Sequence, residues 1–366
     1  MNITKTSVSL LNAPLIQPFR TALGQHNSLE NILFTLEFED GTKGFGEAAV
    51  ASHITGETIE KSVENLKAVG QDLIGQDAGD YLKISSVLHE RLAENKCALA
   101  AVETALMDAL TRQWKIPLWK FFGPRAERLV SDITIVIADL QETQESVKKF
   151  YKQGFRAFKV KIGRDFDLDI KRVLAVKRLA PRSQIYLDAN QGYSAEEILE
   201  FLRLLKKYKV TIELLEQPVP RANWEGLKKV TRETNIPVCA DESVCSLSDA
   251  VRVIQEKAVG VINIKLMKFG LIEAREIASL ARANGIKLMM GGMMETSLAM
   301  TAAAHLAAGM GGFDFIDLDT PFFIKKGYDT NPYLNKSGIY DLRKVKQGIG
   351  ISGDQGIGIS GDQVIG

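Results

Sequence analysis

Short apolar segments recur along most of the chain after residue 130, and helical patterns separate most of them. Stretches between them, such as 167–179 and 272–284, carry apolar residues at helical spacing. Strands that alternate with helices form βαβ units and a parallel sheet. Units repeated at roughly 25-residue spacing favour a closed (β/α)8-type barrel over an open, doubly wound sheet. The apolar segments are 133–138, 157–162, 184–188, 212–215, 238–240, 261–265, 287–290 and 313–317.

A different pattern occupies the first part of the chain. The first 50 residues have strand patterns with a hairpin turn at Asp40–Gly41, and the pattern is then helical up to about Gln113. Strands followed by segregated helices predict an α+β unit. We therefore expect an α+β capping domain over residues 1–125, joined by about 322–366, and a barrel domain over residues 126–321.

The C-terminal tail contains a repeat. The octapeptide GIGISGDQ occurs at 348–355 and again at 356–363, and we expect one copy to form an edge strand. The tail also matches the glycine spacing of a dinucleotide-binding loop. That loop needs a preceding strand and a following helix, so we interpret this match as accidental.

Charge and composition exclude several classes of partner. With 46 Lys and Arg against 45 Asp and Glu, the net charge of +1 provides no field that attracts nucleic acid or an anionic membrane. The apolar stretch 300–310 is too short to span a bilayer, and we expect no signal peptide in the opening residues. The cysteines Cys97, Cys239 and Cys245 form no disulfide framework. We expect a cytoplasmic protein with reduced thiols.

Acidic residues follow three consecutive predicted strands, where parallel strands converge on one mouth of the barrel. These residues are Asp188, Glu216 and Asp241. Three carboxylates at one mouth cannot all stay ionised without a cation. Oxygen ligands select a hard cation, so we expect one Mg²⁺ ion per subunit, with Mn²⁺ as a second possibility.

Lysines flank this predicted metal site. Lys159 and Lys161 end the second strand and share one face, because side chains of a strand alternate. Lys265 ends the sixth strand, which lies opposite the second in a barrel of eight. One amine on each side of a substrate carbon suits a two-base proton transfer through an ene-diolate that a divalent cation stabilises. We expect the cation and the neighbouring amines to lower the lysine pKa values toward the working range.

Two further acids, Asp317 and Asp319, follow the eighth strand and share a face. Two carboxylates away from the metal suit an ammonium group on the substrate. The pattern of lysines and acids described so far resembles that of the enolase superfamily, in its muconate lactonising enzyme subgroup. The resemblance covers nearly the whole chain. The resemblance implies a modified TIM barrel of the (β/α)7β type with a capping domain.

The resemblance also implies site roles. Asp188, Glu216 and Asp241 are the implied Mg²⁺ ligands, Lys161 and Lys265 the implied acid/base pair, and Lys159 the implied contact to the substrate carboxylate. Asp317 and Asp319 resemble the pair that holds the α-ammonium group in dipeptide epimerases. Thr134, Met294 and Glu295 match substrate-contacting positions of those relatives.

The implied reaction is inversion of the α-carbon of the second residue in Ala-Xaa dipeptides. Gly24 stands where relatives acting on Ala-Glu tend to have a basic side chain, which favours small or hydrophobic second residues, D-Ala-D-Ala among them. Arg20 or His26 could still supply a charge, so an Ala-Glu epimerase stays open. A cycloisomerase, an o-succinylbenzoate synthase, an N-acylamino acid racemase, a Schiff-base aldolase and an inactive dipeptide-binding protein also stay open. We expect the protein to form a homo-oligomer and to bind a small dipeptide as its substrate.

Overall fold

The structure, a computed structural model, describes residues 1–353. Within these residues the largest sheet has eight strands in the consecutive order β5 to β12, and all its neighbouring strands are parallel. A hydrogen bond of 2.9 Å from the Asp132 N–H to the Ile316 carbonyl links the two edges of the sheet. The strands are β5 (Ile133–Ile135), β6 (Ala157–Lys161), β7 (Gln184–Asp188), β8 (Leu214–Glu216), β9 (Val238–Ala240), β10 (Val261–Ile264), β11 (Lys287–Met290) and β12 (Phe315–Ile316).

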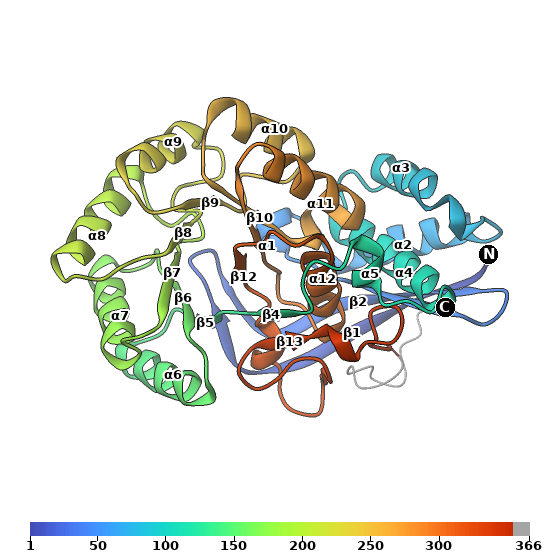
Figure 1. The fold of residues 1–366 in the computed structure, drawn as a ribbon, viewed down its shortest axis with the longest axis horizontal. Helices are drawn as coiled ribbons and strands as arrows, with labels where there is room; N and C mark the ends of the chain where they lie inside the picture. Colours follow the sequence, from blue (N-terminus) through green and yellow to red (C-terminus); the bar gives the residue numbers. More distant parts are fainter. Residues whose placement is uncertain (354–366) are drawn as a thin grey trace.

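An α-helix follows each strand from β5 to β11, whereas β12 leads into the 3₁₀ helix η2 (Thr320–Phe323). This alternation confirms the predicted (β/α)7β barrel, and Figure 1 shows its helices in an arc outside the strands. The helices are α6 (Leu140–Gln153), α7 (Phe166–Leu179), α8 (Ala195–Lys207), α9 (Trp224–Glu233), α10 (Leu247–Glu256), α11 (Leu266–Ala283) and α12 (Ser297–Met310).

Local sequence fixes where most barrel helices begin. Ser194 and Glu197 form a capping box at the start of α8, and the Asp165 side chain caps α7. These side chains accept hydrogen bonds from N–H groups of the first turn that have no partner within the helix. Because a helix begins soon after each strand ends, the residues at the strand ends face one mouth of the barrel.

The capping domain begins with an antiparallel sheet in the order β1-β2-β3, covered on one side by helix α4. Gly44 and Gly46 of β3 let α4 approach closely, since a Cβ atom at Gly46 would overlap the Ala101 carbonyl. The elements are β1 (Ile3–Arg20), β2 (Gln25–Phe38), β3 (Lys43–Ala48), α1 (Ser52–Thr55), α2 (Ile59–Leu73), η1 (Ala78–Asp80), α3 (Tyr81–Arg91), α4 (Lys96–Gln113) and α5 (Leu118–Phe122).

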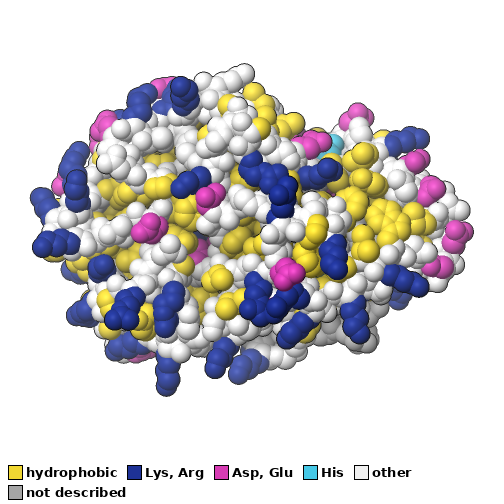
Figure 2. Space-filling model, viewed as in Figure 1, with side chains coloured by type: hydrophobic (Ala, Val, Ile, Leu, Met, Phe, Trp, Pro, Cys, Tyr) yellow, Lys and Arg dark blue, Asp and Glu magenta, His cyan; other side chains and the backbone are white. Residues whose placement is uncertain are grey.

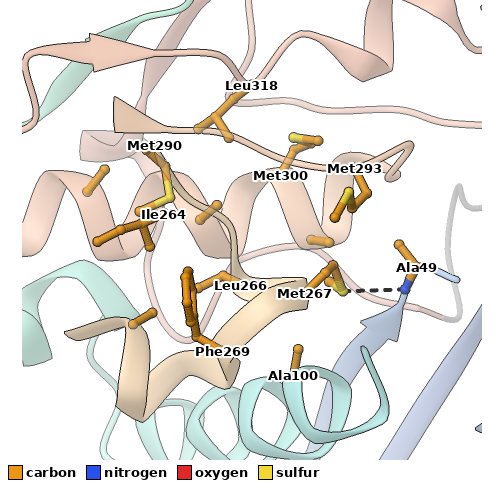
Figure 3. Packing of buried hydrophobic residues seen from close by; sticks show 14 of the residues in the cluster. Ala49, Ala100, Ile264, Leu266, Met267, Phe269, Met290, Met293, Met300 and Leu318 are labelled. Carbon is orange, nitrogen blue, oxygen red and sulfur yellow. Dashed lines mark hydrogen bonds between the residues drawn. The ribbon is translucent and has the colours of Figure 1, made fainter. Parts of the chain in front are cut away.

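Helix α11 of the barrel packs against α4 of the capping domain. Figure 3 shows Met267 of α11 among apolar side chains, where its sulfur accepts a hydrogen bond of 3.4 Å from the Ala49 N–H. Glu103 of α4 is buried and accepts hydrogen bonds of 2.6 and 2.9 Å from the N–H groups of Leu271 and Ile272. Glu103 therefore caps the part of α11 that restarts after the non-helical Gly270.

The segment after the barrel returns to the rest of the chain. Strand β13 (Ile339–Asp341) pairs with β4 (Arg128–Val130), and η3 (Leu342–Lys344) follows. The Ile349 N–H then donates a hydrogen bond of 2.7 Å to Asp108 of α4. These contacts support the proposal that a C-terminal segment joins the capping domain.

One copy of GIGISGDQ was expected to form an edge strand, and residues 348–353 of the first copy, which the structure describes, form none. Gly348 forms an isolated bridge with Pro117, and the positive φ angles of Gly348 and Gly350, 57° and 82°, interrupt an extended chain. The second copy lies outside the described residues.

His305 of α12 is a buried packing residue. Its Nδ1 accepts a hydrogen bond of 2.8 Å from the Trp119 N–H, and its Nε2 lies 3.1 Å from the Ile349 carbonyl. Burial lowers the pKa of His305 to about 3. The ring is therefore neutral and joins the barrel to both parts of the capping domain.

Figure 2 shows more basic than acidic side chains on the face it presents, with basic side chains along the left and lower parts and acidic ones more frequent toward the right edge. Among residues 1–353, none of the helices is both long and apolar enough to cross a bilayer.

Candidate active site

A cavity of about 60 Å³ lies at the mouth of the barrel, beneath the capping domain. Phe19, Thr21 and His26 of the capping domain line its outer side. Because its lining residues come from segments as far apart as β1 and η2, only the folded chain creates the cavity. The predicted site residues that line it are Thr134, Lys159, Lys161, Lys265, Met294, Asp317 and Asp319.

Two lysines of β6 contact the first two acids of the predicted metal site. The Lys159 Nζ lies 3.1 Å from the Asp188 Oδ2 and 2.9 Å from the Glu216 Oε2. The Lys161 Nζ donates a hydrogen bond of 2.6 Å to the same Asp188 oxygen. Both lysines and both acids are buried, so each charge depends on the others for compensation.

The third acid, Asp241, pairs with two lysines. The Lys265 Nζ lies 2.7 Å from the Asp241 Oδ2, and the Lys268 Nζ donates a hydrogen bond of 2.8 Å to the Oδ1. Lys268 was missed by reasoning from the sequence. Its spacing of three residues from Lys265, at the start of α11, is the signal that both amines lie on one side of the helix.

Two asparagines complete this group and were also missed. The Asn190 Oδ1 accepts a hydrogen bond of 3.0 Å from the Lys161 Nζ. The Asn263 Nδ2 donates one of 2.7 Å to the Glu216 Oε1. Asn263 lies two residues before Lys265, so strand alternation could have placed it on the same face.

The pKa shifts of the acids run in both directions, because the charges of Lys161 and Lys159 outweigh burial and lower the pKa of Asp188 to about 2. Burial and the charge of Asp188 raise the pKa of Glu216 to about 7. Burial by itself would lower the pKa of Lys265, but the charges of Asp241 and Glu216 outweigh burial and raise it. The expected fall in the pKa of the lysines applies to the site with a bound cation, and it stays a prediction. That expectation assumed a divalent cation that takes up the carboxylate charge, whereas here the carboxylates act directly on the amines.

The donor set of Asp188, Glu216 and Asp241 has the chemistry that a hard divalent cation prefers, but among the described residues the group of three acids whose oxygens lie within 4.8 Å of one another is Asp132, Asp317 and Asp319. All three groups are buried carboxylates, Asp188 and Glu216 at the ends of neighbouring strands and Asp241 directly after β9, and the Lys159 amine already contacts two of them. Oxygen-only donors suit Mg²⁺ or Mn²⁺. The raised pKa of Glu216 gives the same indication, because a cation there would relieve the repulsion between the acids.

A second group of buried acids adjoins the first, because the Lys159 amine contacts members of both groups. Oxygen atoms of Asp132, Asp317 and Asp319 lie within 4.8 Å of one another. The Asp317 Oδ2 accepts a hydrogen bond of 2.5 Å from Lys159, and the Asp319 Oδ2 accepts one of 2.6 Å from the Thr134 N–H. Burial and the charge of Asp317 raise the pKa of Asp319 to about 7. Burial is the largest cause that raises the pKa of Asp132 well above its ordinary value, and the charges of Asp317 and Asp319 raise this pKa further.

Asp132 was missed by reasoning from the sequence, although it stands two residues before Thr134 and so shares its face of the strand. Glu295, in contrast, is a predicted substrate contact that is not among the described residues lining the cavity. Its Oε1 accepts a hydrogen bond of 2.5 Å from the Met293 N–H, and burial raises its pKa to about 8. A role for Glu295 in contacting substrate stays a prediction.

Comparison with known proteins gives matches along nearly the whole chain. Residues 4–123 match the N-terminal domain of mandelate racemase / muconate lactonizing enzyme, and residues 142–357 match the enolase C-terminal domain-like family. A hydrophobic dipeptide epimerase of Citrifermentans bemidjiense is 48% identical over 351 residues, which are 94% of this chain and 95% of the relative. An aromatic dipeptide epimerase of Herpetosiphon aurantiacus is 39% identical over 94% of this chain and 97% of its own.

Solved structures give the same relationship. The dipeptide epimerase of Enterococcus faecalis V583, in complex with Mg and the dipeptide L-Leu-L-Tyr, has a TM-score of 0.91 and 33% sequence identity. The match covers 96% of this chain and 100% of that one. The likeness thus extends over both the capping domain and the barrel.

Proposed function

Because this chain belongs to the mandelate racemase / muconate lactonizing enzyme family, we propose that it is a dipeptide epimerase dependent on a divalent metal. It is an isomerase of the racemase and epimerase class. Relatives named for hydrophobic and aromatic dipeptides support a hydrophobic second residue in the substrate. The proposed substrates are Ala-Xaa dipeptides with a small or hydrophobic second residue, including D-Ala-D-Ala.

One observation carries the proposal. Lys161 and Lys265 reach the same cavity from β6 and from the end of β10, which are separated by three strands in the sheet order. Each amine contacts a different acid of one carboxylate group, Lys161 through Asp188 and Lys265 through Asp241. Amines that approach one carbon from opposite sides can remove a proton from one face and deliver a proton to the other.

The proton transfer requires the two lysines to be in opposite protonation states. The lysine that faces the α-proton must be neutral and takes that proton, while the lysine on the other face is an ammonium and donates one. A divalent cation on Asp188, Glu216 and Asp241 would supply positive charge against the carboxylate of the substrate's second residue. The Lys159 ammonium would hold the same carboxylate, since its Nζ lies between Glu216 and Asp317.

Two acid groups could hold the metal, and we assign it to Asp188, Glu216 and Asp241. Both proposed catalytic lysines pair with this group, so a cation there would also free their amines for proton transfer. In the other group, Asp317 already accepts a hydrogen bond from Lys159, and Asp319 accepts one from the Thr134 N–H. Asp317 and Asp319 instead suit the α-ammonium group of the dipeptide.

The cavity wall supports an apolar side chain on the second residue. Phe19 and Ile54 of the capping domain line it together with Met293 and Met294 of the barrel. Methionine side chains adapt to apolar groups of different shape. An Ala-Glu substrate is the second candidate, because His26 also lines the cavity and could pair with an acidic side chain.

The proposed function is tested by α-proton exchange in D₂O. The protein with Mg²⁺ is incubated with a library of Ala-Xaa dipeptides, and mass spectrometry follows deuterium at the second residue. We expect exchange and inversion, fastest with hydrophobic second residues and slow with Ala-Glu. Absence of exchange throughout the library would refute the proposal, and preference for Ala-Glu would replace the assigned substrate class.

Replacing Asp319 with asparagine should raise KM for dipeptides. Asn can still accept the hydrogen bond from the Thr134 N–H but loses the negative charge that pairs with the substrate ammonium. A charge-assisted hydrogen bond contributes about 1.5–3 kcal/mol, so KM should rise roughly 10- to 100-fold. Steady-state kinetics check this, and N-acetylated dipeptides serve as the control. These lack the ammonium group, so Asp319→Asn should change their turnover little; an equal loss with both substrate types would contradict the assignment.

The assembly and location of the enzyme are separate proposals. We propose a homo-oligomer located in the cytoplasm, following the family resemblance and the unpaired cysteines. Light scattering of the purified protein measures the oligomeric state directly.

A further inference from the structure

A buried ion pair contacts the backbone of Lys161, and neither of its residues is among the described residues that line the cavity. Arg172 of α7 is fully buried, and its guanidinium donates hydrogen bonds of 2.6 Å to the carbonyls of both Lys161 and Val136. The same guanidinium contacts the Asp169 carboxylate at 2.8 Å and the Thr143 hydroxyl at 3.1 Å. Arg172 therefore ties together the points where the chain leaves β5 and β6.

Asp169 holds the other side of the same turn. Its Oδ2 accepts hydrogen bonds of 2.7 Å from the Gly163 N–H and 3.0 Å from the Tyr193 hydroxyl. The Arg172–Asp169 pair thus binds the carbonyl of Lys161 and the N–H two residues later. Gly163 has a φ of 108°, and a Cβ atom there would lie 2.7 Å from the Ala189 carbonyl, so the turn has little freedom to rearrange.

The backbone of Lys265 is held in a different way. Lys265 leads directly into α11, and its carbonyl accepts a hydrogen bond of 3.0 Å from the Lys268 N–H. The hydrogen bonds of Arg172 within the described residues go to other segments. A change at Arg172 should therefore disturb one proposed catalytic lysine and leave the other in place.

We propose that Arg172 is a positioning residue that fixes Lys161 for proton transfer on one face of the substrate carbon. This inference rests on the proposed two-lysine reaction. The Lys161 amine stands at the end of a flexible four-carbon chain, so its position depends on the backbone that carries it. A displacement of about 1 Å in a reacting group can reduce the rate about 100-fold.

The test compares the rates at which the two epimers of one dipeptide exchange their α-proton in D₂O. Lys161→Ala and Lys265→Ala first establish which epimer depends on which lysine. Arg172→Lys keeps the charge opposite Asp169 but cannot reach both backbone carbonyls. We expect this variant to slow exchange of the epimer that depends on Lys161 at least 10-fold more than exchange of the other.

Arg112→Lys is the matched control. Arg112 of α4 also pairs with a buried acid, Asp108, at 2.8 Å and binds a backbone carbonyl, that of Ile351. It lies in the capping domain, so its replacement should leave the ratio of the two exchange rates unchanged. A purely structural role for Arg172 would likewise lower both rates by the same factor, and that result would overturn the proposal.

A milder variant keeps the test decisive if Arg172→Lys does not fold. Thr143→Val removes one acceptor of the guanidinium and leaves the arginine itself. We expect a shift of at least about threefold in the same ratio, and an unchanged ratio would count against the proposal. A different result would contradict the proposed function itself. In that case the wild-type protein would exchange the α-proton of neither epimer of any dipeptide.

Discussion

Replacing Lys161 or Lys265 with alanine should abolish epimerisation. Each variant lacks the group that removes or delivers a proton on one face, and a positioned acid or base contributes about 10²- to 10⁴-fold to a rate. Since inversion needs both lysines, we expect a loss of at least about 1,000-fold in either variant. Chiral chromatography of an Ala-Xaa dipeptide measures this loss.

The two lysine variants should differ in isotope exchange. With one lysine left, that lysine can still remove and return a proton on its own face. Each variant should therefore exchange the α-proton of one epimer, and the two variants should favour opposite epimers. Retention of inversion in either variant, or loss of exchange for the same epimer in both, would exclude the two-base assignment.

Lys229→Ala provides the control for these variants. Lys229 is a surface lysine that pairs with Glu196 at 2.5 Å, and it lies on α9, outside the cavity. Its replacement should leave epimerisation unchanged. Thermal melting of all three variants separates a lost chemical group from a lost fold.

Removing the divalent metal should eliminate activity, and replacing one ligand should raise the metal concentration the enzyme needs. We expect excess EDTA to stop exchange and added Mg²⁺ to restore it. In Glu216→Gln, a neutral amide replaces a carboxylate of the proposed site but can keep its contact to Asn263. The Mg²⁺ concentration for half-maximal activity should then rise at least about 100-fold, because even groups behind a metal ligand affect affinity 10- to 100-fold.

Asp132→Asn tests the other acid group against this assignment. Asp132 lies close to Asp317 and Asp319. If the metal were bound by these three acids, loss of the Asp132 carboxylate would raise the Mg²⁺ concentration that the enzyme needs. Under our assignment, Asp132→Asn keeps the wild-type Mg²⁺ requirement. If Asp132→Asn raises the requirement and Glu216→Gln does not, the metal belongs to the second group instead.

The sequence by itself determined the order of the barrel elements and the residues at the ends of their strands. Both follow from local rules: side chains alternate along a strand, and polar caps begin the helices, as Ser194 and Glu197 do for α8. Parallel strands bring their ends to one mouth, so Lys161 and Lys265 could be expected in a common site before any coordinates. Both line the cavity that the fold creates.

Only the tertiary structure decided which groups surround those ends and in which direction their pKa values move. Lys268, Asn190, Asp132 and Arg172 act through contacts between segments that are distant along the chain, and no local pattern fixes such distances. The pKa of Lys265 rises because the Asp241 carboxylate lies 2.7 Å away, which outweighs the effect of burial. Coulomb interactions depend on separation and on the surrounding medium, and the folded chain alone sets both.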